Sequence, residues 1–390
     1  MNTSNETVPR RILLPILFGF FVMGFVDIVG IATNYVKEDF SLSSTYANLL
    51  PMMVFIWFAL CSIPTGILMG KIGKKYTVVI SLAITVVAML MPLLSYSFAN
   101  LLVAFALLGI SNTILQVSLN PLIAGVVSAG KVASTLTLGQ FIKSLSSFLG
   151  PILVGAAASF WGNWKWTFLL YAAVSLLSLI WFCFGIPDKR EEVSRAGLRS
   201  TLSLLLDRKV LLLFLGILFI VGVDVGLNIM IPDFLITRTD LPLRSAGLGT
   251  SLYFVSRMVG SFLGALLLVR VKPSVYLRVS MLVAVGAFLL LLGLDTLWAM
   301  LILIAIIGLS CASVFSILFS YALQHQPERG NELSALMIMG VSGGALVSPV
   351  LGFLSDSFGA TAGMASLLFC LLYLGLLSFW IGKEENRKKV

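Results

Sequence analysis

Long apolar segments recur along the whole chain, and they constrain the fold more than any other feature of the sequence. About 20 consecutive apolar residues span the hydrocarbon core of a bilayer. About twelve such segments can be marked, at residues 12–36, 46–70, 76–97, 99–126, 132–160, 165–186, 209–235, 245–269, 275–294, 297–324, 332–357 and 361–382. Only 11% of the 390 residues are charged, against about 25% in a soluble domain. The sequence therefore predicts an all-α membrane protein with twelve transmembrane helices.

Lys and Arg are distributed unevenly among the connections between these segments. If the N-terminus faces the cytoplasm, twenty of the 26 Lys and Arg residues lie on the cytoplasmic side and four on the other side. Such an excess marks cytoplasmic loops, so both termini are predicted to be cytoplasmic in a bacterial inner membrane. The formal net charge of +9 then reports orientation, and it does not indicate a nucleic-acid partner. The first segment has no cleavage motif and is predicted to be a retained span.

The chain divides into two halves that resemble each other. The stretch "ILFGFFVMGFVDIVG" resembles "LFLGILFIVGVDVGL", "LLGISNTI" resembles "IIGLSCAS", and "GPILVGAAASFWG" resembles "SPVLGFLSDSFG". The three pairs are offset by 197 to 199 residues, in the same order. Two six-span halves related in this way are typical of the major facilitator fold, in which the substrate site lies near the membrane midplane between two bundles. We therefore expect an N-terminal bundle at 1–186, a cytoplasmic linker at 187–208 and a C-terminal bundle at 209–390.

Four ionisable side chains lie deep within the predicted spans. They are Asp27, Lys143, Asp224 and Arg257. Each such charge costs at least about 2.5–3.5 kcal/mol at the bilayer centre, so it is expected to face a cavity or a partner. The hypothesis is that Asp27 pairs with Lys143 and Asp224 pairs with Arg257. A static ion pair would be structural, whereas an acid that exchanges its partner for a proton would couple a gradient to solute movement, with Asp27 and Asp224 as candidates.

Carboxamide side chains share these spans with the charges. Gln116, Asn120, Gln140 and Asn228 each carry both donor and acceptor atoms, which suits a solute rich in hydroxyl groups. The alternative role for such amides is hydrogen bonding between helices. We predict that they bind substrate together with Lys143 and Arg257.

Enzymatic chemistry has no support in the sequence. No phosphate-binding loop of the G-x-x-x-x-G-K-[ST] type is present, and a single histidine with four scattered cysteines matches no metal site. We expect no catalytic residues, no cofactor and no metal, and a monomer that interacts with lipid, a small-molecule substrate and a coupling ion.

Three motifs resemble the fucose–galactose–glucose:proton symporter family of the major facilitator superfamily. They are "MGFVDIVGIATNYVKEDFSLSSTYANLL", "LQVSLNPLIAG" and "GQFIKSLSSFLGP". The resemblance, closest to the glucose/galactose branch, implies a twelve-span sugar importer with Asp27 as the protonation site. It places sugar contacts on Gln116, Asn120 and Gln140.

The chain departs from that family's pattern at three places. Val26 replaces the Asn before the acid, Lys143 replaces an Asn, and Gly70 stands where a cytoplasmic loop signature has Asp. Lys143 could neutralise Asp27, or it could bind an anionic sugar together with Arg257. The hypotheses that follow are a monosaccharide importer driven by protons or sodium, a carrier of uronic or sialic acid, an exporter of amphipathic compounds, and a membrane sensor without transport.

Overall fold

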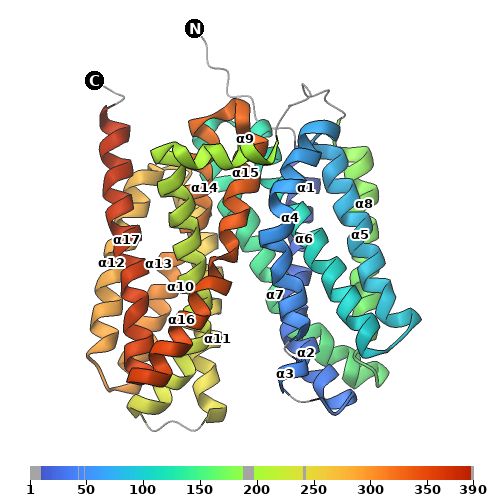
Figure 1. Cartoon of the computed structure of the whole chain (residues 1–390), viewed down its shortest axis with the longest axis horizontal. Helices are drawn as coiled ribbons and strands as arrows, with labels where there is room; N and C mark the ends of the chain where they lie inside the picture. Colours follow the sequence, from blue (N-terminus) through green and yellow to red (C-terminus); the bar gives the residue numbers. More distant parts are fainter. Residues whose placement is uncertain (1–9, 43, 48, 188–196, 240–242, 388–390) are drawn as a thin grey trace. The chain divides into compact units, whose positions relative to one another are not determined.

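The computed structural model describes residues 10–42, 44–47, 49–187, 197–239 and 243–387. These residues form helices joined by short turns (Figure 1). The part of the predicted linker at 188–196 lies outside them. In chain order the elements are α1 (Arg10–Met23), η1 (Gly24–Asp27), α2 (Ile28–Asp39), α3 (Ser44–Ala47), α4 (Leu49–Ile72), α5 (Lys74–Leu94), α6 (Phe98–Val126), η2 (Ala129–Lys131), α7 (Val132–Trp161), α8 (Trp166–Gly185), α9 (Leu198–Ser203), η3 (Leu204–Leu206), α10 (Arg208–Thr239), α11 (Leu243–Leu267), α12 (Pro273–Leu292), α13 (Leu297–Cys311), α14 (Val314–His325), η4 (Pro327–Arg329), α15 (Gly330–Met339), η5 (Gly340–Ser342), α16 (Gly343–Phe358) and α17 (Ala360–Arg387).

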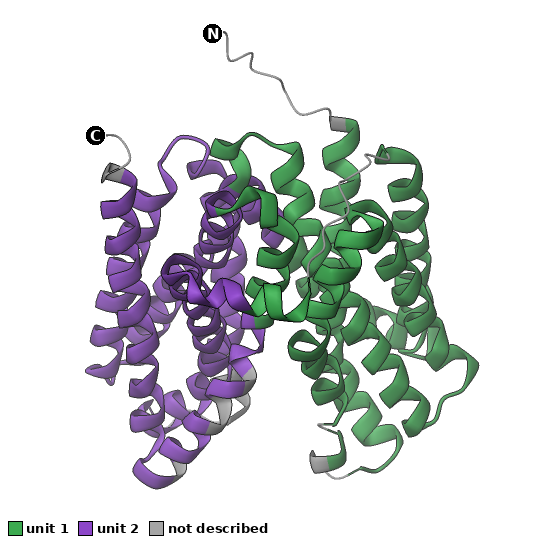
Figure 2. Ribbon diagram, turned by 45° about the horizontal axis from the view of Figure 1, so that its top comes forward, with its two compact units in different colours: residues 1–132, 142–202, 326–339 green, residues 133–141, 203–325, 340–390 purple. Residues whose placement is uncertain are grey.

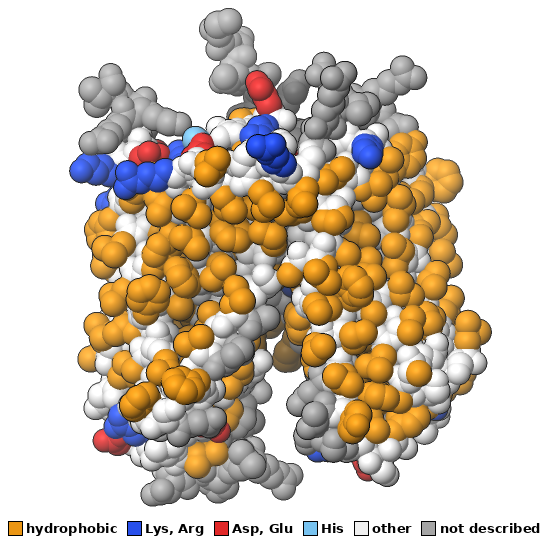
Figure 3. Space-filling model, viewed as in Figure 1, with side chains coloured by type: hydrophobic (Ala, Val, Ile, Leu, Met, Phe, Trp, Pro, Cys, Tyr) orange, Lys and Arg blue, Asp and Glu red, His pale blue; other side chains and the backbone are white. Residues whose placement is uncertain are grey.

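Eleven helical segments in the described part of the chain are long and apolar enough to cross a membrane. They coincide with eleven of the predicted spans, and the remaining prediction, 332–357, falls on α15, η5 and α16. Hydrophobic side chains cover the visible face of each unit along most of the helix length, and Lys and Arg lie toward the helix ends (Figure 3). This distribution is the one that a bilayer requires.

The chain packs into two compact units, coloured separately in Figure 2. The first contains residues 1–132, 142–202 and 326–339, and the second contains 133–141, 203–325 and 340–390. In the first unit α15 packs on α4 and α6, where Ser334 Oγ donates to the carbonyl of Val117 at 2.6 Å. In the second, Ser134 Oγ donates to the carbonyl of Ala265 at 2.7 Å. Compared with the predicted bundles, the second unit includes residues 133–141 of the first bundle, and the first unit includes residues 326–339 of the second. The boundaries of the bundles remain a prediction.

Two glycines bring neighbouring helices into close contact at equivalent places in the two halves. A Cβ on Gly109 of α6 would lie 2.3 Å from the carbonyl oxygen of Val54 on α4, and a Cβ on Gly308 of α13 would lie 2.7 Å from that of Tyr253 on α11. Both members of the second pair are 199 residues beyond those of the first. The repeat seen in the sequence therefore extends to backbone packing. It shows which residues of α4 and α11 are equivalent in the two halves.

In a second pair of equivalent contacts, an acid of the first half is replaced by a base in the second half. Asp39, at the end of α2, accepts a hydrogen bond from the hydroxyl of Tyr96 in the connection between α5 and α6. Arg238, near the end of α10, bonds to Asp295 between α12 and α13 at 2.7 Å. Both residues of the second contact again lie 199 residues beyond those of the first. The geometry of the repeat is thus retained where its chemistry has diverged.

The first span is not a continuous α-helix. The 3-10 turn η1 separates α1 from α2, and Asp27 is its last residue. A Cβ on Gly24 would lie 2.5 Å from the carbonyl oxygen of Lys143 on α7, so α7 approaches this turn closely. A stretch of 3-10 helix within a longer helix often marks a functional hinge or a sequence under strain.

Candidate functional site

The acid of the seventh span is held by two side chains of the eighth. Arg257 Nη2 lies 2.7 Å from Asp224 Oδ2, and the hydroxyl of Tyr253 donates to Asp224 Oδ1 at 2.6 Å. Asp224 is 8% exposed and Tyr253 is fully buried. Tyr253 and Arg257 are four residues apart on α11 and therefore lie on one face. The structure thus contains the predicted Asp224–Arg257 ion pair, with a tyrosine that the sequence argument missed.

The acid of the first span has different surroundings. Asp27 is exposed at the end of the 3-10 turn, although Val26 and Ile28 beside it are buried. Its carboxylate accepts a hydrogen bond from the hydroxyl of Ser147 on α7 at 2.5 Å. The same Ser147 Oγ lies 3.0 Å from the carbonyl oxygen of Lys143 one turn earlier. Asp27 therefore has a neutral partner where Asp224 has a cation.

The predicted ion pair between Asp27 and Lys143 is not present among the described residues. Lys143 is half-buried on α7, and it contributes its backbone carbonyl to the close contacts with Gly24 and Ser147. The physical reason is the close approach of α7 to the turn. Lys143 and Ser147 share one side of α7, and it is the shorter serine side chain that reaches the carboxylate.

Three amides of α6 form a buried hydrogen-bonded series beside the 3-10 turn. Asn112 Nδ2 donates to the carbonyl oxygen of Met23 at 2.7 Å, and Gln116 Nε2 donates to Asn112 Oδ1 at 2.7 Å. Asn120 Nδ2 then donates to the backbone carbonyl of Gln116 at 2.9 Å. All three are at most 4% exposed. Asn120 Oδ1 is a buried acceptor with no hydrogen-bond partner among the described residues.

The other two predicted amides are placed differently. Gln140 is half-buried on α7, in the segment that packs with the second unit. It lies three residues before Lys143 and so on the same side of that helix. Asn228 is exposed on α10, one turn beyond Asp224. Neither is part of the buried amide series on α6.

The residues that the sequence argument missed are Ser147, Tyr253 and Asn112. Each lies four residues from a predicted site residue on the same helix, namely Lys143, Arg257 and Gln116. Positions four apart on a helix are neighbours in space. A search for polar side chains one turn from each candidate would therefore have found all three.

A separate polar cluster lies at the start of α10. Asp207 Oδ1 accepts hydrogen bonds from the backbone amides of Lys209 and Val210 at 2.8 and 3.3 Å, as a helix-capping residue does. Its other oxygen lies 2.8 Å from His325 Nε2, at the end of α14. Burial by itself would raise the pKa of Asp207, but these hydrogen bonds and the nearby imidazole outweigh it and lower that pKa.

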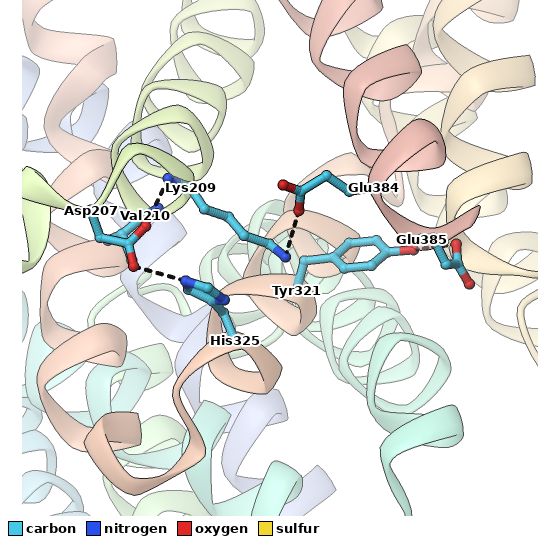
Figure 4. Close-up of polar contacts among 7 residues, drawn as sticks. All are labelled: Asp207, Lys209, Val210, Tyr321, His325, Glu384 and Glu385. Atoms are coloured by element: carbon cyan, nitrogen blue, oxygen red, sulfur yellow. Dashed lines mark hydrogen bonds and ion pairs between the residues drawn. The ribbon is translucent and has the colours of Figure 1, made fainter. Parts of the chain in front are cut away.

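Two further contacts line a cavity of about 210 Å³ beside this cap. Lys209 Nζ lies 2.9 Å from Glu384 Oε2, and the Tyr321 hydroxyl donates to Glu385 at 3.3 Å. Figure 4 shows the Lys209 and Tyr321 side chains directed toward the two glutamates of α17. Among the described residues, no group of three or more His, Cys, Asp and Glu side chains is placed to hold a metal ion.

An internal repeat and ionisable groups inside the spans are typical of secondary transporters. The sequence matches the Major Facilitator Superfamily over residues 16–349. The chain therefore belongs to this superfamily, which confirms the predicted fold class and identifies a transporter, not an enzyme.

Named relatives cover nearly the whole chain. A glucose/galactose transporter of Brucella abortus is 26% identical over 375 residues, which is 91% of this chain and 90% of the relative. A putative glucose/galactose transporter of Helicobacter pylori is 27% identical over 399 residues, with coverage of 94% and 96%. These similarities agree with the resemblance drawn from the motifs.

A solved structure has the same fold. A Major Facilitator Superfamily transporter, FucP, in the outward conformation, superposes with a TM-score of 0.82 at 17% identity, covering 94% of this chain and 98% of that one. FucP is described as the fucose:proton symporter of E. coli.

Proposed function

We propose that this protein is a secondary active importer of a monosaccharide, driven by protons through Asp27. It would work by alternating access as a monomer in a bacterial inner membrane, with both termini in the cytoplasm. The relatives named as glucose/galactose transporters support the class of substrate. The observation that carries the coupling role is the environment of Asp27.

Asp27 has the surroundings that reversible protonation requires. Its side chain is exposed, and its partner is a hydroxyl, which can donate to a carboxylate or accept from a carboxylic acid. Asp224 is instead bonded to a guanidinium, so a proton could replace that partner only by breaking an ion pair. Of the two acids, Asp27 is therefore the one suited to gain and lose a proton during transport.

The amides of α6 are suited to sugar hydroxyls. Asn120 Oδ1 has no internal donor among the described residues, and leaving a buried acceptor unpaired costs about 1–3 kcal/mol. A sugar hydroxyl that donates to this oxygen would recover that cost. Gln116 and Asn120 are accordingly the first proposed sugar contacts, with Gln140 and Asn228 as further ones.

The proposal is tested with Asp27→Asn in proteoliposomes. We expect the variant to lose accumulation of glucose or galactose driven by a pH gradient while it retains counterflow exchange, which needs no net proton movement. Asp295→Asn is the control, because Asp295 is exposed and paired with Arg238 near the ends of the helices. Accumulation by Asp27→Asn at the native level would refute the role of Asp27. An imposed sodium gradient separates sodium coupling from proton coupling.

A second candidate is a carrier of anionic sugars, and Lys143 is the observation that favours it. This half-buried lysine forms no ion pair among the described residues, whereas Arg257 is already paired with Asp224. If Lys143 binds a carboxylate, glucuronate or sialic acid will compete for counterflow in the native protein and lose that ability in Lys143→Gln. Absence of counterflow with every sugar would instead favour an exporter of amphipathic compounds or a sensor.

A further inference from the structure

Asn112 bonds both to the residue before the turn that carries Asp27 and to Gln116, one of the proposed sugar contacts. Its Nδ2 group bonds to the carbonyl oxygen of Met23, the last residue before the 3-10 turn. Its Oδ1 atom accepts from Gln116 Nε2. One buried side chain, 3% exposed, therefore contacts both the turn that carries Asp27 and a proposed sugar contact.

The two hydrogen bonds fix the orientation of both amides. The Met23 carbonyl accepts only from the NH₂ group of Asn112, so the oxygen of Asn112 must face Gln116. That oxygen can accept only from the NH₂ group of Gln116, so the Oε1 atom of Gln116 faces away from Asn112. No hydrogen bond to Gln116 Oε1 is found in the described part of the chain, and this acceptor remains for a ligand.

The same bonds constrain the backbone at the turn. Where a helix tightens into 3-10 geometry its hydrogen bonds are poorer, so a side-chain donor to the preceding carbonyl stabilises the break. Gly24 allows α7 to approach this turn from another direction. The turn is therefore held by α6 through Asn112 and by α7 through its backbone.

We propose that Asn112 is a positioning residue that sets the orientation of Gln116 and the geometry of the Asp27 turn together. Sugar binding at Gln116 would then act on the turn through one intervening amide, and a change in the turn would act on sugar affinity. This inference rests on the proposed function and names the connection between its sugar site and its proton site.

The first test measures the turn without any sugar. Hydrogen exchange is followed by mass spectrometry in peptides covering residues 20–30, with the full chain in lipid nanodiscs. We expect amides of the turn to exchange about tenfold faster in Asn112→Ala and in Asn112→Leu, the latter matched in size. Gln116→Ala, which removes only the second bond, should give a smaller increase. Ser118→Ala is the matched control, because Ser118 is buried on the same helix and bonds to its own backbone.

The second test measures the connection itself by counterflow kinetics in the same variants. We expect Asn112→Ala to raise the KM for sugar about tenfold with a smaller change in the maximal rate. We expect the effects of Asn112→Ala and Gln116→Ala to be non-additive in the double variant. The pH at half-maximal accumulation should shift in Asn112→Ala and stay native in Ser118→Ala.

Three results would overturn the inference. They are equal exchange rates in Asn112→Ala, Asn112→Leu and Ser118→Ala, additive effects on KM, or an unchanged pH profile. Failure of the proposed function is distinguishable, because a native protein that moves no sugar would still show the exchange difference if Asn112 holds the turn. Should Asn112→Ala fold poorly, the exchange measured in Gln116→Ala still decides whether the two features are connected.

Discussion

Asp27 and Asp224 occupy equivalent places in the two halves and have opposite surroundings. Asp27 is exposed at a helix break with a serine as its partner. Asp224 is buried in an unbroken helix between a tyrosine and an arginine. The comparison teaches that the repeat contains two acids, and that the neighbouring helices give one a neutral partner and the other a cation.

The difference can be traced to one helix in each half. The glycine contacts show that Tyr253 of α11 is the equivalent of Val54 of α4 in the other half. In the same register Arg257 corresponds to Phe58, which is 2% exposed. The second span thus presents buried apolar side chains where the eighth span presents a hydroxyl and a guanidinium. A carboxylate in the first span receives no cation from this direction.

The largest expected effect comes from breaking the pair in the C-terminal half. Arg257→Leu leaves the Asp224 carboxylate buried without its cation, and removing one partner of a buried pair costs about 3–5 kcal/mol. Thermal unfolding in detergent should show a strong decrease in stability. Adding Asp224→Leu should restore much of it, since the uncompensated charge is removed. No recovery in the double variant would mean that Arg257 acts through other contacts.

Smaller effects are expected from the glycines that fix the register of the comparison. Gly109→Ala and Gly308→Ala place a Cβ 2.3 and 2.7 Å from a neighbouring carbonyl oxygen, and overpacking of this kind costs about 1–3 kcal/mol. Both variants should lower the melting temperature, Gly109→Ala by more. Gly125→Ala on α6 is the control, because its Cβ meets no atom within 4 Å. Equal stability of all three proteins would mean that the two glycine contacts do not fix the helices, and the equivalence drawn from them would fail.

A matched pair of hydroxyl deletions sharpens the contrast between the acids. Tyr253→Phe removes a buried hydrogen bond to Asp224 and should cost about 1–2 kcal/mol of stability. Ser147→Ala removes an exposed one from Asp27 and should cost less. The pH profile of transport should show the reverse order, with a shift in Ser147→Ala and none in Tyr253→Phe. A shift in Tyr253→Phe alone would transfer the coupling role to Asp224.

The smallest effect on stability is expected from a third acid, Asp207, at the start of α10. Because the pKa of Asp207 is lowered in the folded protein, its contribution to stability is present above its ordinary value of about 3.9. That contribution is lost as the pH falls through the lowered value. Asp207→Ala should therefore weaken the protein near neutral pH by about 1 kcal/mol, because it removes the side chain that caps α10. The difference from the native protein should shrink in acid, as pH-dependent melting curves will show.

Much of the architecture could be predicted from the sequence because the length of each apolar segment is read directly along the chain. The ion pair of Asp224 with Arg257 was also predictable from two opposite charges in adjacent spans. The partner of Asp27 was not, because the choice between Lys143 and Ser147 depends on how closely α7 approaches the turn. The break at Gly24–Asp27 has no proline to signal it, and the role of Asn112 becomes visible only once that break is known.

The contacts at Gly109 and Gly308 have an evolutionary consequence. Where main chains touch, the spacing of two helices is fixed by the backbone and not by the size of the side chains around it. After a gene duplication, substitutions on the facing surfaces can then accumulate without moving the scaffold. One copy is free to become a rigid anchor while the other keeps a reactive group, so division of labour between duplicated bundles needs no change of fold.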